Sequence, residues 1–187
     1  YIYFAPDHNG TDRHGEVLRY DAQGAFTSTG AWTPFDSGAG GVGTDPDGFS
    51  DVLFDGRHLY FAPLDNGSGA HGEVLRYDVS APFASAASWS AYDPGADGVG
   101  TDPDGFSSLV SDGRYVYFAP ADAGAGPSGE VMRLDTTAPW PEGDGPLRRL
   151  MVAQDAGGAI KGVVRGDVFW GAGERAAAIA GRMESPG

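Results

Sequence analysis

The side chains best suited to chemistry lie in an Asp-Pro-Asp-Gly loop that occurs twice. Its aspartates are Asp45 and Asp47 in the first loop and Asp102 and Asp104 in the second. Calcium favours several oxygen ligands at alternate loop positions and a glycine that turns the loop. The first and last ligand positions of such a loop are not acidic here. The pattern predicts either a calcium site completed by carbonyl and water oxygens, or a turn whose aspartates accept backbone N–H groups.

Six further residues have side chains suited to binding. A tryptophan at a fixed strand position could stack on a sugar ring or pack between sheets. A histidine beside a glycine could bind a metal or make a structural hydrogen bond. Asparagines in nearby loops suit sugar hydroxyls or cations, and equally suit a solvated surface. These candidates are Asn9, His14, Trp32, Asn66, His71 and Trp89.

Most of these residues recur at a spacing of 57 residues. Between the first two copies, about 33 of 57 positions are identical. Because a single active site needs unlike groups gathered once, near-identical copies indicate recurring binding sites or none, and we expect no catalytic residues. The clearest copies are residues 3–6, 60–63 and 117–120, and residues 15–21, 72–78 and 129–135.

Each copy contains the pattern of four short strands. In the second copy, apolar runs at residues 49–54 and 57–62 flank Asp55-Gly56, which predicts a hairpin with a type I′ turn. Asp112-Gly113 predicts the same turn in the next copy. Pro63 should end the second of these strands, since proline has no ladder donor. Further strands are expected at residues 16–20 and 32–35 and at their copies.

Four strands in each long unit predict an all-β fold of β-propeller blades, with three four-stranded repeats in residues 1–140. A β-trefoil is the alternative. Residues 141–187 form a divergent tail, with an expected strand at 147–152, a degenerate hairpin at 160–170, and a short helix or disordered end at 174–183. Three blades fall short of the usual four to eight. We therefore expect either a fragment or a homo-oligomer that completes a ring.

The charge distribution restricts the partners. The chain carries 26 acidic and 12 basic residues, with a net charge of −14, which disfavours nucleic acid. No apolar run is long enough to span a membrane. The chain has no cysteine. The location stays open, with the extracellular space or the cell envelope favoured, and carbohydrate or protein are the expected partners.

Three sequence blocks carry a resemblance to other proteins. The chain resembles uncharacterised bacterial proteins with tandem repeats of the β-propeller type. Their DGRYVYF-P block is similar to residues 112–120, their HGEVLRYD block to residues 129–135, and their GTDPDG block to residues 100–105. The resemblance covers residues 1–140 and implies a propeller-like β repeat, but no activity. Residues 141–187 depart from the pattern.

Together these patterns predict a non-catalytic binding or scaffold module for carbohydrate or protein, with calcium as the candidate ion. Any ligand should lie at the end of the sheets where the Asp-Pro-Asp-Gly loops meet the loops of Asn9 and Asn66. The alternative is a fragment of a β-propeller hydrolase whose catalytic residues lie outside this chain.

Overall fold

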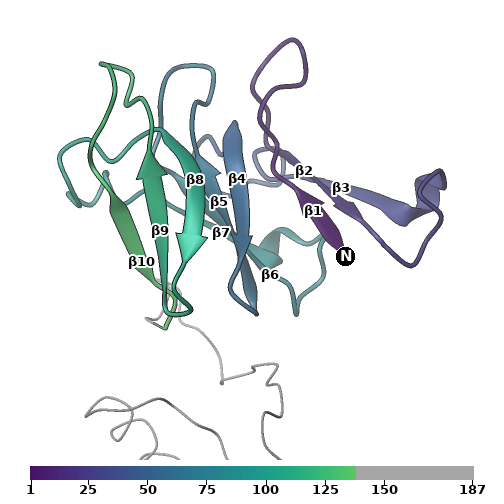
Figure 1. The fold of residues 1–187 in the computed structure, drawn as a ribbon. Coiled ribbons are helices and arrows are strands. Elements are labelled where there is room, and N and C mark those ends of the chain that lie inside the picture. The colour runs from purple at the N-terminus through teal and green to yellow at the C-terminus, as the bar shows by residue number, and fades with distance from the viewer. Residues whose placement is uncertain (138–187) are drawn as a thin grey trace, which may run out of the picture. The chain divides into compact units, whose positions relative to one another are not determined.

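A computed structural model describes residues 1–137, which form three antiparallel sheets (Figure 1). The first sheet contains β1 (Ile2–Phe4), β2 (Glu16–Tyr20) and β3 (Trp32–Asp36). The second contains β4 (Phe49–Phe54), β5 (His58–Pro63), β6 (Val74–Asp78) and β7 (Trp89–Tyr92). The third contains β8 (Phe106–Ser111), β9 (Tyr115–Pro120) and β10 (Met132–Asp135). The predicted all-β class is confirmed.

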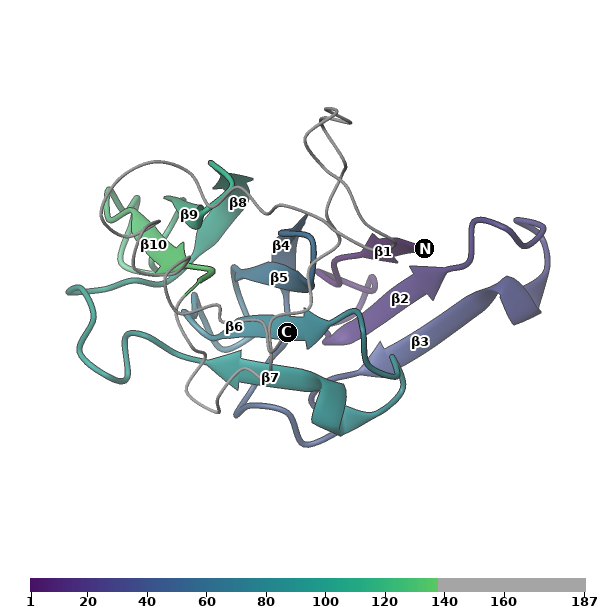
Figure 2. The same ribbon diagram turned by 90° about the horizontal axis from the view of Figure 1, so that it is seen from below.

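Within each sheet the strands lie in chain order, and Figure 2 shows β4 to β7 side by side in the second sheet. Single 3₁₀ turns, η1 (Thr29–Ala31) and η2 (Ala86–Ser88), lead into β3 and β7. In the described part of the chain only the second sheet has the predicted four strands. The expected features at 147–152, 160–170 and 174–183 lie outside the described residues. No helix within residues 1–137 is long and apolar enough to cross a membrane.

The predicted hairpins form, but their turns are not type I′. Gly56 has a φ of +104°, whereas every residue other than glycine in residues 1–137 has a negative φ, including Asp55. The Asp55 carboxylate instead accepts the N–H groups of Arg57 and His58, at 2.8 and 2.7 Å. This side-chain turn fixes the loop without a second residue in the left-handed region.

The prediction that this strand ends at Ala62, before Pro63, is wrong by one residue. Pro63 is the last residue of β5 and lies opposite Phe49, and Pro120 lies opposite Phe106. A proline is tolerated in this terminal position because its missing donor lies beyond the regular ladder.

The second sheet is buried on both faces. All six residues of β5 are buried, and the four from Leu59 to Ala62 alternate between two hydrophobic cores. Leu59 and Phe61 point into the first core, which also contains Val17 of the first sheet. Tyr60 and Ala62 point into the second core, which also contains residues of the third sheet. The period of two along a strand therefore places neighbouring sheets face to face.

The leading strands of the second and third sheets lie beside each other (Figure 1). Each contains a bulge near its start, between Phe49 and Asp51 in β4 and in the equivalent place in β8. Ser50 Oγ donates to the Phe106 carbonyl at 2.7 Å, and Asp51 Oδ2 accepts the Leu109 N–H at 2.8 Å. The bulge thus directs polar side chains of one sheet to the backbone of the next.

Candidate functional site

The two Asp-Pro-Asp-Gly loops join consecutive sheets. Gly48 N donates to the His14 carbonyl at 3.1 Å, and the Gly48 carbonyl accepts the Leu64 N–H at 3.0 Å. Gly105 N repeats the first contact, with the His71 carbonyl at 3.1 Å. These bonds place the loops at the same end of the sheets as the loops of Asn9 and Asn66, as the meander topology predicted.

Only glycine fits at the end of each Asp-Pro-Asp-Gly loop. Gly48 and Gly105 have φ values of +66° and +67°. A Cβ at Gly48 would overlap the carbonyl oxygen of Asp65, and one at Gly105 would overlap that of Asp122. The glycine is therefore needed for close backbone approach between loops as well as for the turn.

A glutamate just before the third strand of the second and third sheets holds the same loop. Glu73 accepts the Thr44 N–H at 2.8 Å through Oε1 and the Asp45 N–H at 3.0 Å through Oε2. Glu130 accepts the N–H groups of Thr101 and Asp102, each at 2.9 Å. These bonds from Asp102 and Thr101 lower the pKa of Glu130. We call this pairing of a glutamate with two successive backbone donors the glutamate clasp.

The sequence did not identify the clasp glutamates as functional residues. They recur at a spacing of 57, and each lies 29 residues after the threonine whose N–H it accepts. That constant offset from the Gly-Thr-Asp block was the available signal. It pointed to a contact only once the loop and the strand were known to lie side by side.

The four candidate metal ligands do not gather with other acidic or histidine side chains of residues 1–137 into a cluster of three or more. Asp45 and Asp102 are exposed, and Asp47 and Asp104 are half-buried. Burial, together with the charges of Asp45 and Asp36, raises the pKa of Asp47. Residues 1–137 contain no group of three or more histidine, aspartate or glutamate side chains that could hold a metal ion. The geometry gives the calcium prediction no support, and it stays a prediction.

The Asp104 carboxyl has the same environment in the second loop. Burial raises its pKa, and the neighbouring charges of Asp102 and Asp93 raise it further. Both loops thus concentrate negative charge at the end of the sheets where any ligand was expected from the sequence.

The candidate asparagines shape their own loops. Asn9 Oδ1 accepts the N–H groups of Thr11 and Asp12 at 2.9 and 3.0 Å, and Asn66 Oδ1 accepts the Ser68 N–H at 3.0 Å. These are local turns in which the side chain replaces a backbone acceptor. Their acceptor oxygens are already engaged within the loop.

The two candidate histidines differ in burial. His14 is half-buried, whereas His71 is only 9% exposed and lies against Phe49, with ring centroids 5.8 Å apart. Burial lowers the pKa of His71. The nearby carbonyls of Asp47 and Gly48 oppose this shift, but neither ring nitrogen makes a hydrogen bond of normal geometry with a described residue. His71 is therefore a neutral packing residue near neutral pH.

The two candidate tryptophans pack in aromatic clusters. Trp89 is 6% exposed, stacks on Phe35 at 4.8 Å and on Tyr77 at 4.6 Å, and donates its Nε1–H to the Phe83 carbonyl. Trp32 makes the equivalent bond to Phe26 and is half-buried on the first sheet. Trp89 cannot offer a ring face to a sugar, because both of its faces are covered.

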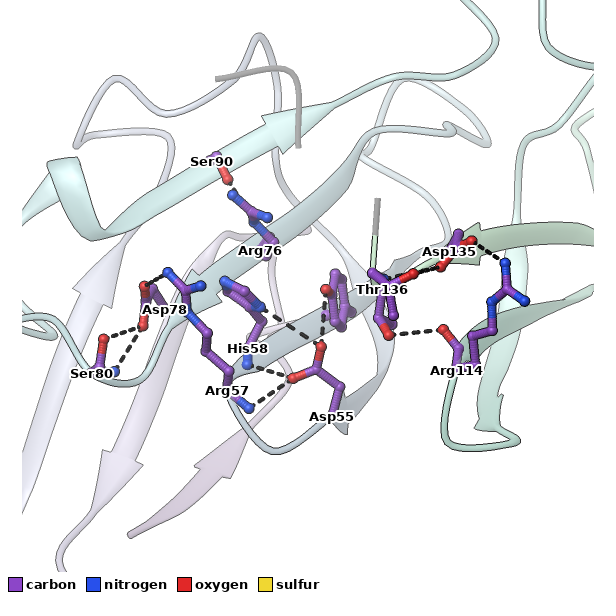
Figure 3. Close-up of polar contacts among 12 residues, drawn as sticks. Asp55, Arg57, His58, Arg76, Asp78, Ser80, Ser90, Arg114, Asp135 and Thr136 are labelled. Atoms are coloured by element: carbon purple, nitrogen blue, oxygen red, sulfur yellow. Dashed lines mark hydrogen bonds and ion pairs between the residues drawn. The ribbon is translucent and has the colours of Figure 1, made fainter. Parts of the chain in front are cut away.

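A second polar network lies at the opposite end of the sheets (Figure 3). Asp55 accepts the Tyr60 hydroxyl at 3.2 Å and lies 3.7 Å from His58 Nδ1. Burial acts to raise the pKa of Asp55, but bonds from the His58 side chain and from the backbone of His58 and Arg57 outweigh it, and the pKa is lowered.

Ion pairs repeat at this end in successive sheets. Arg57 pairs with Asp78 at 3.0 Å, and Arg114 pairs with Asp135 at 2.9 Å (Figure 3). From the sequence Asp55 was predicted only as a turn residue, and neither arginine was a candidate. The constant spacing between the Asp-Gly-Arg block and the later aspartate was the signal for this contact.

The comparisons with known proteins give one match, which covers the C-terminal part of the chain. A family model described as a 3D domain matches residues 121–187, which is less than half of the chain. No curated protein and no solved structure matches the chain. The chain is thus similar to a 3D domain from Ala121 onward, directly after β9 and through the residues that the structure does not describe.

Proposed function

We propose that the described sheets are blades of a β-propeller-type scaffold, a non-catalytic module that binds protein. The blade arrangement is supported by the face-to-face packing of successive sheets and by the contact between β4 and β8. In a propeller the leading strands lie nearest the central axis, so successive leading strands are neighbours. A β-trefoil receives less support, because its barrel requires pairing between strands of different repeats, and the described strands pair within their own sheets.

The glutamate clasp is the observation that carries the non-catalytic assignment. Glu73 and Glu130 use both carboxylate oxygens to hold backbone donors of the preceding loop. A general acid or base must instead reach a substrate. The recurring polar residues thus have a shared role in joining repeats, which is the behaviour of a repeat scaffold.

Protein is favoured over carbohydrate as the partner. The ring of Trp89 lies between Phe35 and Tyr77, so it is not a platform for a sugar. The exposed apolar side chains of the first sheet include Ile2, at 48%, and Phe4, at 44%. Apolar side chains gathered on one sheet suit a protein surface. The propeller-hydrolase alternative finds no favouring observation in residues 1–137.

Thermal unfolding with candidate ligands tests this proposal. We expect the midpoint to stay the same in calcium, in chelator, and with a panel of monosaccharides and disaccharides. A ligand present at about 100 times its dissociation constant would stabilise the fold by about 2.7 kcal/mol, which a melting curve detects readily. A clear rise would overturn the protein-binding scaffold in favour of a small-ligand site.

Two double variants identify the cause of any rise in the melting midpoint. Asp47→Asn plus Asp104→Asn removes the loop carboxylates, and Asp12→Asn plus Asp97→Asn makes the same charge change at exposed positions. A calcium effect that only the first pair abolishes would place the ion in the Asp-Pro-Asp-Gly loops. An effect that both pairs reduce equally would reflect overall charge.

A further inference from the structure

One side of the first sheet carries an apolar surface. The equivalent surface of the second sheet is covered by another sheet, whereas no described sheet covers this one. Phe4 is 44% exposed and Phe26 is 68% exposed, whereas their equivalents 57 residues later, Phe61 and Phe83, are 0% and 2% exposed. We call this surface the receiving face. It consists of Ile2, Phe4, Leu18, Tyr20, Phe26 and Trp32.

The second sheet shows what covers such a surface. The equivalents of the receiving face all belong to the first core. The opposite side of the first sheet packs on them, with Phe35 stacked on Trp89 at 4.8 Å and Arg19 placed over the ring of Phe83 at 4.5 Å. In the second sheet this surface is thus covered by the opposite side of the first sheet, which is the preceding copy of the repeat.

The third sheet carries the matching surface, also uncovered by described residues. Val131 is 62% exposed, whereas its equivalent in the second sheet, Val74, is 1% exposed in the second core. We call this surface the presenting face. It consists of Tyr117, Ala119, Val131 and Arg133, the equivalents of Tyr3, Ala5, Val17 and Arg19 in the first sheet.

Building on the scaffold function proposed above, we propose that the receiving face of one chain binds the presenting face of a second copy. Val131 of the second copy would take the place that Val17 has against the second sheet, and Arg133 would lie over the ring of Phe26, as Arg19 lies over Phe83. Residues 1–137 of each chain offer one face of each kind, so the contact is head-to-tail and two chains close a ring. Six sheets lie within the range of known propellers.

This interface depends on apolar contact rather than on the glutamate clasp. Glu16, the equivalent of Glu73, is exposed beside the receiving face. The third copy of the repeat does not continue into a Gly-Thr-Asp-Pro-Asp-Gly block, since residues 157–162 read Gly-Gly-Ala-Ile-Lys-Gly. We therefore expect no glutamate clasp between Glu16 and the second chain, and replacing this glutamate should leave the contact unchanged.

Light scattering of the full chain after size exclusion, over a wide concentration range, tests the inference. We expect a mass of twice 19.4 kDa that falls toward 19.4 kDa on dilution. Phe26→Glu on the receiving face and Val131→Glu on the presenting face should each weaken association by about thirtyfold or more, as loss of a central apolar anchor does. Phe54→Glu is the control, since Phe54 is 55% exposed but lies on the second sheet.

Mixing the two variants distinguishes a head-to-tail contact from a symmetric one. A pair made of one Phe26→Glu chain and one Val131→Glu chain keeps one unaltered interface, so the mixture should associate more strongly than either variant alone. If receiving faces met each other instead, Val131→Glu would leave the dimer intact. That result would overturn the inference.

A parent chain that stays at 19.4 kDa at every concentration would also overturn it. The melting midpoint of Phe26→Glu then separates two explanations. A large drop would mean that the chain covers its own receiving face, and an unchanged midpoint would mean that the face is bare. Neither result touches the scaffold proposal, whose failure appears as stabilisation by calcium or a sugar.

Discussion

Glu73 Oε1 lies 2.8 Å from the backbone nitrogen of Thr44, a residue that precedes the second sheet, and accepts its hydrogen bond. Glu73 Oε2 accepts the next N–H along the chain, that of Asp45, at 3.0 Å. Because Glu73 itself is only 9% exposed, the carboxylate would be costly to bury without these donors. The strand and the loop therefore stabilise each other.

Replacing Glu73 with alanine should lower the free energy of unfolding by about 1.5–3 kcal/mol, the usual contribution of hydrogen bonds to a charged group. Urea denaturation measures this change. Glu16→Ala is the matched control, because Glu16 occupies the equivalent position at the start of β2 in the first sheet, and it is exposed. Equal losses for the two variants would show that the clasp contributes nothing beyond the loss of a strand residue.

Gly48 should be less tolerant of substitution than Gly56. Both have positive φ, but a Cβ at Gly48 would overlap the Asp65 carbonyl, whereas a Cβ at Gly56 would meet nothing within 4 Å. Gly56→Ala should cost about 1–2 kcal/mol from the left-handed backbone alone. Gly48→Ala should cost roughly 1–3 kcal/mol more than this, because its Cβ would also overpack the site.

Chemical denaturation of both glycine variants measures the difference. Unequal costs with Gly48→Ala the larger are expected. If Gly56→Ala proved as costly as Gly48→Ala, the close approach between the Asp-Pro-Asp-Gly loop and the following sheet would have no energetic weight.

The strands could be predicted from the sequence because they depend on local patterns. The alternation of apolar residues and the Asp-Gly pairs located β4 and β5 to within a residue. The type I′ turn was predicted wrongly because Asp55 has another way to close the hairpin. Its carboxylate accepts the Arg57 and His58 N–H groups, so its own φ stays negative.

The roles of the recurring polar residues could not be predicted in the same way. Glu73, Gly48 and Trp89 each have an identical counterpart 57 residues away, but this recurrence did not separate binding from packing. That distinction depends on which neighbouring sheet each residue meets. For Trp89 the sequence favoured packing over stacking on a sugar, and the stacked rings of Phe35 and Tyr77 agree with packing.

The Asp55 network should contribute more than its copy around Asp112. The Asp55 carboxylate accepts the backbone N–H groups of Arg57 and His58 and the hydroxyl of Tyr60, and it lies beside the His58 ring. Asp112, in contrast, is exposed. Asp55→Ala should lower the free energy of unfolding by about 2 kcal/mol. Asp112→Ala, the matched control, should cost less.

The effect of Asp55→Ala should depend on pH. The pKa of Asp55 is lowered in the folded state, so its stabilising effect is present above the ordinary carboxyl pKa and is lost as the pH falls through the folded value. The parent and the variant should therefore converge in strong acid. Denaturation curves at several pH values measure this, and a gap that persists in acid would contradict the ionic role of the carboxylate.

His71 should make the protein less stable in mild acid. Its pKa is lowered by burial, so the unfolded chain takes up the proton first. The stabilising effect of the neutral ring is complete above the ordinary histidine pKa of about 6.5 and is lost as the pH falls through that value toward the folded one. The charges of Glu73 and Asp45 oppose the shift without reversing it.

The chain supplies its own replacement for this histidine, since Ser128 occupies the equivalent position in the third copy, where its Oγ accepts the Glu130 N–H at 3.1 Å. His71→Ser should remove the part of the pH dependence between about pH 7 and pH 5 that belongs to this ring. Leu75→Ala, a core variant without a titrating group, should lower stability at every pH and keep the slope of the parent. Urea midpoints across this range decide the matter: if His71→Ser and Leu75→Ala give parallel curves, the buried ring does not titrate with unfolding.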